Sequence, residues 1–204
     1  MDERIESLLR FWFEPQPRSR EDLEQRFDRW FKADPAVDAE ITARFGATAR
    51  LAARGELDAW ADFAKGRLAL ILLLDQVPRH LHRGTAAAFA QDAKALALST
   101  EGIEKGYDRE LSVLERGFFY MPLQHAESLD AQELSVRMFE KLAADDGAPD
   151  FYGPALESML DYARQHRDII ARFGRFPHRN TALGRADTDA EREYLRGGGP
   201  RFGQ

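Results

Sequence analysis

The sequence contains no cysteine. This absence excludes disulfide bonds, thiolate zinc sites, iron–sulfur clusters and cysteine nucleophiles together. A chain of 204 residues buries roughly 70% of its unfolded surface on folding, so it needs no covalent or metal staple. We therefore expect a single domain over residues 1–196 and a loose tail over residues 197–204, which opens with three glycines.

Long apolar runs and runs of like charge are also missing. The longest apolar run, Leu68 to Leu74, has seven residues, whereas a membrane-spanning helix needs about 20. The net charge is −6, and basic residues form no stripe of the kind that binds nucleic acid. The first residues lack the basic and apolar segments of a signal peptide. We expect a cytoplasmic protein that binds neither membranes nor nucleic acid.

No stretch alternates apolar and polar residues as a β-strand does, whereas helical spacing recurs along the whole chain. The run Leu68 to Leu74 is apolar on all sides, which predicts a central, fully buried helix. Prolines, glycines and capping residues divide the pattern into eight or nine helices. The sequence thus predicts an all-α globular domain of stacked helical hairpins.

The expected helix boundaries follow from these breaks and caps. We expect helices over Ile5 to Phe13, from Ser19, from Asp34 to Arg54, from Asp58 to Val77 with Pro78 as the stop, from Thr85, from Asp108 to Pro122, from Ser128 or Asp130 to Ala144, from Gly153 to Gly174, and a short one capped by Thr188.

Three polar segments interrupt the helices and are the only candidates for chemistry. In the first, Asp75 directly follows the apolar run, and a buried carboxylate needs a partner or it will protonate. Arg79 and Arg83 are the nearest cations in the sequence. Their pair with Asp75 could form the floor of a pocket, or it could simply order the end of a helix.

The second segment places His125 and Glu127 in a break between two helices. They could form a proton-transfer pair in which the glutamate orients the imidazole ring. They could equally cap the following helix. The two interpretations stay open at the level of sequence.

The third segment, Arg172 to Thr181, contains Arg175, His178, Arg179 and Asn180 among glycine, proline and two phenylalanines. The aromatic residues indicate that this backbone tucks in, so its arginines need acidic partners. We expect Asp75, Asp92 and Glu127 to be these acidic partners. His166 lies on the apolar stripe of the preceding helix, either as a core residue or as a member of the same pocket.

A metal site is a further alternative, because the chain has five histidines. No two of them have the four-residue spacing that places two ligands on one helical face. His80 and His82 could still assemble with His178 near Asp75. The sequence has no P-loop, no dinucleotide-binding glycine motif and no nucleophile elbow. We expect neither a metal nor a cofactor.

Taken together, the polar segments resemble a known family. The segments are Asp75-Gln76-x-Pro78-Arg79-x-x-x-Arg83-Gly84, Ala88-Phe89-Ala90-x-Asp92, Tyr120-Met121-Pro122-Leu123-x-His125-x-Glu127 and Phe173-Gly174-Arg175-Phe176-Pro177-His178-Arg179-Asn180. In this order they resemble the bacterial family called domain of unknown function 924, over nearly the whole chain. The resemblance implies a tetratricopeptide-like helical fold but no activity. Ala126 stands where the family more often has serine, which argues against a serine nucleophile there.

Two functions remain open, and we favour the first. One is a pocket for an anionic small molecule, because arginine binds oxyanions and histidine moves protons near neutral pH. Its ligand-binding residues would be Asp75, Arg79, Arg83, Arg175, Arg179 and Asn180, and its catalytic residues His125, Glu127, His166 and His178. The other is a scaffold for a protein or peptide partner, in which the polar segments act as structural struts.

Overall fold

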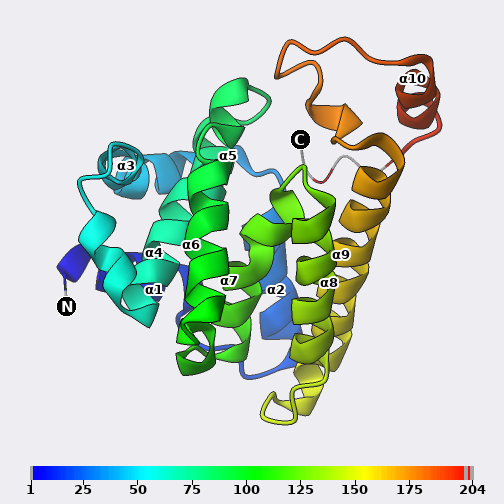
Figure 1. The fold of residues 1–204 in the computed structure, drawn as a ribbon. Helices are drawn as coiled ribbons and strands as arrows, with labels where there is room; N and C mark the ends of the chain where they lie inside the picture. The colour runs from blue at the N-terminus through cyan, green and yellow to red at the C-terminus, as the bar shows by residue number, and fades with distance from the viewer. Residues whose placement is uncertain (1, 200–201, 203–204) are drawn as a thin grey trace.

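The computed structural model describes residues 2–199 and 202. In this part of the chain it contains helices and no strand, as predicted (Figure 1). The α-helices are α1 (Glu3–Phe13), α2 (Arg20–Phe31), α3 (Pro35–Ala53), α4 (Ala64–Ile71), α5 (Val77–Leu81), α6 (Asp92–Glu104), α7 (Val113–His125), α8 (Leu129–Ala143), α9 (Gly153–Phe173) and α10 (Asp189–Arg196). A π-helical turn, η2 (Leu72–Gln76), joins α4 to α5, so the described residues form nine continuous helices.

The helices enclose one large apolar core. The central helix, α4 with the turn η2, is buried from Leu68 to Leu74, as the absence of a polar face predicts. Helices α7, α8 and α9 pack side by side, and α10 lies beyond them at the end of a long loop (Figure 1). A smaller apolar cluster joins Ile169 and Ile170 of α9 to Phe176 of the following loop. The tetratricopeptide-like arrangement of the helices stays a prediction.

Several predicted boundaries are confirmed by the caps that form. The hydroxyl of Ser19 accepts a hydrogen bond from the Asp22 N–H, and Ser128 and Thr188 cap α8 and α10 in the same way. Helix α9 ends at Gly174, whose φ of 69° lies in the left-handed region that favours glycine. The expected tail over 197–204 falls partly outside the described residues, at 200, 201, 203 and 204.

The two prolines expected to end helices do not end them. The helix runs through Pro78 to Leu81, because the turn η2 widens the helix just before it and the Val77 N–H donates to the Leu72 carbonyl. Likewise, Pro122 lies inside α7, which continues to His125. A proline removes one hydrogen bond of a helix. Near this break the Ser99 hydroxyl donates to a neighbouring carbonyl of α7 at 2.6 Å.

Three predicted helix starts are wrong by several residues, for one reason. Short 3₁₀ turns come first: η1 (Asp58–Asp62), η3 (Ala86–Phe89) and η4 (Tyr107–Glu110). Asp58, Thr85 and Asp108 therefore lie at such turns, and the α-helices begin afterwards. Helix α7, for example, starts with a capping box in which Glu115 accepts from the Ser112 N–H at 2.9 Å. Two further 3₁₀ turns, η5 (Asp150–Tyr152) and η6 (Pro177–Arg179), flank α9.

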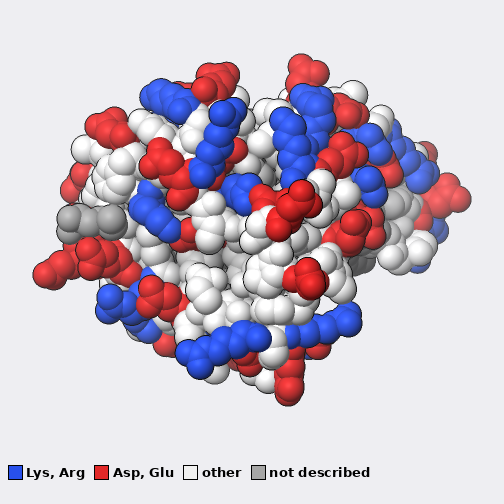
Figure 2. Space-filling model, turned by 90° about the horizontal axis from the view of Figure 1, so that it is seen from below, with Lys and Arg blue, Asp and Glu red and all other residues white. Residues whose placement is uncertain are grey.

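Helix length and surface charge add two observations. Between residues 2 and 199, none of the helices combines the length and apolar content that crossing a bilayer requires. On the face seen in Figure 2, acidic and basic side chains lie interspersed.

Candidate functional site

The three polar segments meet at one cavity of about 430 Å³. This volume lies in the range of ligand-binding pockets. The cavity opens between α2, α5, α7, α8, α9 and the turn η6. The predicted site residues on its wall are Arg79, Arg83, His125, His166, His178 and Arg179.

Asp75 lies directly behind this wall, in the π-helical turn η2, and is fully buried. Its carboxylate accepts a hydrogen bond from Gln76 at 2.5 Å, and Arg79 Nη1 lies 3.1 Å from it. Burial by itself would raise the pKa of Asp75, but Arg79 and His125 outweigh it and hold the pKa below its usual range. Asp75 is therefore ionised at neutral pH. Helical irregularities of this π type are frequent at functional sites.

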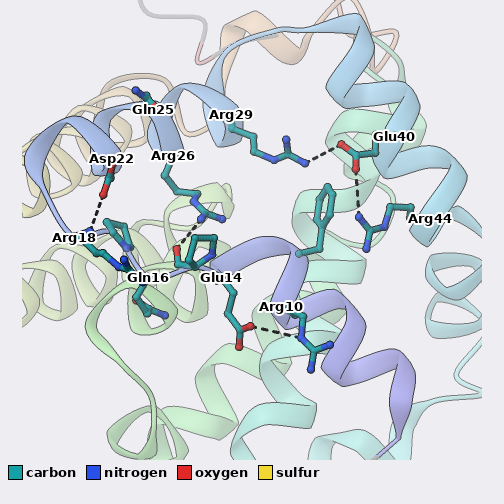
Figure 3. Close-up of a pocket in the computed structure, with 13 residues that line it drawn as sticks. Arg10, Glu14, Gln16, Arg18, Asp22, Gln25, Arg26, Arg29, Glu40 and Arg44 are labelled. Atoms are coloured by element: carbon teal, nitrogen blue, oxygen red, sulfur yellow. Dashed lines mark hydrogen bonds and ion pairs between the residues drawn. The ribbon is translucent and has the colours of Figure 1, made fainter.

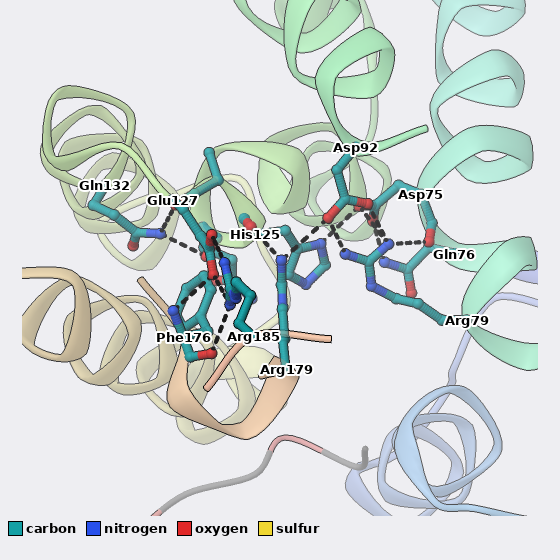
Figure 4. Close-up of polar contacts among 12 residues, drawn as sticks. Asp75, Gln76, Arg79, Asp92, His125, Glu127, Gln132, Phe176, Arg179 and Arg185 are labelled. Atoms are coloured by element: carbon teal, nitrogen blue, oxygen red, sulfur yellow. Dashed lines mark hydrogen bonds and ion pairs between the residues drawn. The ribbon is translucent and has the colours of Figure 1, made fainter. Parts of the chain in front are cut away.

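His125 is the last residue of α7, and Asp75 holds its ring from behind (Figure 4). The distance between His125 Nδ1 and Asp75 Oδ1 is 2.7 Å. Because the carboxylate is ionised, Nδ1 carries the proton and donates it. Burial lowers the pKa of His125, and the charge of Arg79 lowers it further, against the opposing effect of Asp75. The ring is thus neutral at pH 7, with the lone pair on Nε2, which has no hydrogen-bond partner among residues 2–199 and 202.

Arg79 and Asp92 brace this pair. Arg79 lies one helical turn after Asp75, and its guanidinium binds both oxygens of Asp92 at 3.0 Å. Such a two-pronged arrangement is the strong form of the arginine–carboxylate contact. Arg79 therefore lies between two carboxylates, and its Nη groups are occupied by protein partners.

Arg179 differs from Arg79 because part of its hydrogen-bonding capacity is unused. Its guanidinium lies between the rings of Phe89 and Phe176, at 4.6 and 4.5 Å from their centroids. Nη1 donates to Asp92 at 3.3 Å and to the His125 carbonyl at 3.0 Å. Nε is buried and has no hydrogen-bond partner among the described residues.

The charge of Arg179 is also incompletely compensated. Burial and the neighbouring charge of Arg79 lower the pKa of Arg179 to about 10, even though Asp92 opposes the change. The side chain is only 7% exposed. A buried cation with a spare N–H edge, next to a neutral histidine, is a suitable place for an anion.

Two further histidines, His166 and His178, line the cavity. The ring of His166 lies 6.1 Å from that of His125, and its Nδ1 donates to the Tyr162 carbonyl at 2.7 Å. Burial lowers the pKa of His166 well below its usual value, so this ring is neutral. Phe202 stacks on His166 with ring centroids 3.7 Å apart, and its ring lies 5.6 Å from that of His178.

A second histidine–aspartate pair, in which only the histidine lines the cavity, was not predicted from the sequence. His80 Nδ1 lies 2.7 Å from Asp38 Oδ1, and Arg83 donates to the same oxygen at 3.0 Å. Arg83 thus pairs with Asp38 and not with Asp75. Asp38 belongs to α3, far from the polar segments in sequence, and no local pattern marks it.

Three predicted site residues lie away from the cavity and fasten the C-terminal loop. Glu127 accepts from the Phe176 N–H at 2.8 Å and binds Arg185 through both oxygens (Figure 4). Arg175 pairs with Glu191 at 2.6 Å, and Asn180 donates to Asp187 at 2.7 Å. Glu127 therefore does not orient the His125 ring, one of the two roles considered for it, because Asp75 occupies that position.

Two further features of the described residues concern possible metal ligands and a second cavity. Among the residues that the structure describes, no three His, Asp or Glu side chains are grouped closely enough to hold a metal ion. A wider hollow of about 870 Å³ lies between α1, α2 and α3 (Figure 3). In it, Arg29 and Arg44 both pair with Glu40, and Arg10 pairs with Glu14.

Comparisons with known proteins agree with the resemblance in the motifs. The family model for bacterial proteins of unknown function, DUF924, matches residues 8–199. A solved structure of a protein of unknown function from Agrobacterium tumefaciens is 39% identical, with a TM-score of 0.79, and the match covers 95% of this chain and 97% of that one. A search of curated proteins gives no match. The chain belongs to the DUF924 family of bacterial proteins.

Proposed function

We propose that this protein binds an anionic small molecule in the cytoplasm, with the anion on the free edge of Arg179 and His125 as the adjacent acid–base group. The observation that carries the proposal is the buried Nε–H of Arg179, which has no partner among the described residues. A buried donor without an acceptor costs about 1–3 kcal/mol. An oxyanion at this edge recovers that free energy and balances the charge.

The arrangement of charges on the cavity wall supports the same proposal. Lys32, Arg79, Arg83 and Arg179 line the cavity, whereas the acids that pair with the arginines, Asp38, Asp75 and Asp92, do not. One acid, Asp28, is on the wall, paired with Lys32 at 2.6 Å. A ligand therefore meets the cations first and the compensating carboxylates only behind them.

His125 gives the site a means to move a proton. Its neutral Nε2 can accept one from the ligand or from a water molecule, and Asp75 stabilises the imidazolium that forms. Asp75 also fixes the tautomer, because Nδ1 has to donate to the carboxylate.

A thermal-shift screen of carboxylates and phosphates against the purified protein tests the proposal. A ligand at 100 times its dissociation constant adds about 2.7 kcal/mol, or about 5–10 °C for a domain of this size. The shift should disappear in Arg179→Gln and persist in Arg164→Gln, which removes an exposed arginine of α9. A panel without any shift, or equal shifts in the two variants, would contradict the proposal.

The scaffold remains the alternative, favoured by the pairs that fasten the C-terminal loop. Arg179→Gln should destabilise the protein by about 1–3 kcal/mol under either proposal, because Asp92 keeps its contacts with Arg79. The scaffold proposal further expects that the wild-type protein shows no thermal shift with any anion of the panel, whereas the binding proposal expects a shift that Arg179→Gln abolishes.

A further inference from the structure

We propose that the anion at Arg179 is a carboxylate with an extended apolar body, in the manner of a medium-chain fatty acid. The inference rests on the proposed function, since it assigns the rest of the ligand whose head occupies the Arg179 edge. The cavity has a cationic end with histidines and an end lined mostly by apolar side chains. A ligand that fills it needs an anionic group at one end and an apolar group at the other.

Helices α7 and α9 define these ends. On α7, Met121 and His125 are one turn apart, and both line the cavity. On α9, Met159 and His166 are seven residues apart and also line it. The two histidine rings lie 6.1 Å from each other, so both helices carry their histidine at the Arg179 end.

Apolar side chains contribute most of the lining around Met159, although Ser158, Asp28 and Lys32 also line the cavity. Met159 lies against Gly117 of α7, where a Cβ atom would come within 2.6 Å of the Met159 methyl group. Gly117 precedes His125 by two helical turns, and Met159 precedes His166 by about as much. Helices α7 and α9 therefore run in the same direction, with Gly117 beside Met159 at the end opposite the two histidines. Phe139 of α8 adds a ring to the wall and packs 6.0 Å from the ring of Tyr120.

The distance between the ends sets the length of the ligand. Seven residues of α-helix span about 10 Å, which separates the histidine end from the methionine end. Methionine side chains are flexible and adapt to apolar chains of varying shape. Aromatic side chains of α2, Phe27, Trp30 and Phe31, form the remaining apolar wall. An unbranched or slender apolar body fits these walls.

The head group follows from the donors that remain on Arg179. Nη1 of Arg179 donates to Asp92 and to the His125 carbonyl. Among the described residues, neither Nε nor Nη2 of Arg179 has a hydrogen-bond partner. Two parallel N–H groups on one edge match the two oxygens of a carboxylate. Arg79 has its Nη groups bound to Asp75 and Asp92, so one singly charged head suits the site.

A chain-length series tests the inference. The dissociation constants of straight-chain carboxylates from acetate to decanoate are measured by isothermal titration against the wild-type protein. We expect the affinity to rise about fourfold for each added methylene until the cavity is full. In Met159→Gln, which keeps the length of the side chain, the gain per methylene should fall while acetate binding is unchanged. The wild-type series decides the matter even if this variant does not fold.

Other outcomes separate the two levels of the argument. Short and long carboxylates that bind equally well would overturn the apolar body and leave the anion site in place. Octanol that binds as tightly as octanoate would overturn the carboxylate head and the proposed function with it, while the apolar end stands. Failure of every carboxylate to bind would overturn this inference, and the phosphates of the thermal-shift panel would then decide whether the anion site itself stands.

Discussion

The pair of His125 and Asp75 gives the sharpest energetic prediction, and a double-mutant cycle measures it. Asp75→Asn keeps the shape of a fully buried side chain but removes its charge. Breaking a buried ion pair costs about 3–5 kcal/mol when the partner is left alone. Here Arg79 keeps both contacts with Asp92, so we expect a loss of about 2–3 kcal/mol in the free energy of unfolding.

The coupling between the two residues is the informative quantity. Combined with His125→Asn, the cycle should give a coupling energy of about 1.5–3 kcal/mol at pH 7, the value of a hydrogen bond to a charged group. Urea unfolding followed by far-ultraviolet circular dichroism supplies the four free energies. A coupling below about 0.5 kcal/mol would mean that the residues act independently, and the reasoning about the tautomer would be refuted.

Two further predictions concern pH and the C-terminal loop. Burial lowers the pKa values of His80, His125 and His166. The unfolded chain therefore binds more protons than the folded one below about pH 6.5. The free energy of unfolding should fall on acidification, by at most about 1.4 kcal/mol per pH unit for each histidine. A flat unfolding free energy between pH 7.5 and 5.5 would argue against neutral buried rings. Glu127→Gln should destabilise the protein by about 1–3 kcal/mol through its contacts with Arg185 and leave octanoate affinity unchanged, and a tenfold loss of affinity would place this carboxylate in the site after all.

Local sequence patterns predicted the helices well where local interactions decide them. The stripe of α9 and the caps at Ser19 and Thr188 depend on residues within a few positions of each other. Pro78 and Pro122 misled the prediction, because the chain compensates for them inside continuing helices. The turn η2 that accommodates Pro78 depends on packing around the buried helix, which no short window of sequence contains.

The sequence predicted which residue types make up the candidate site, but not which side chains pair with one another. Arginine, histidine and aspartate beside glycine and proline marked Asp75, His125 and Arg179. However, Asp75 and His125 are 50 residues apart, and the nearer Glu127 was the better local candidate for the ring. Asp38 lies on an ordinary helix, so its pairing with His80 had no signal at all. Pairing across helices is set by tertiary packing, which composition and spacing do not encode.

The most direct test of the anion site is the dissociation constant of octanoate for the wild-type protein, Arg179→Gln and the control Arg164→Gln at pH 7. Loss of charge-assisted hydrogen bonds worth about 1.5–3 kcal/mol predicts binding about 10- to 150-fold weaker in Arg179→Gln. The exposed Arg164 should make no difference. Equal affinity in all three proteins would contradict the assignment of the anion to Arg179.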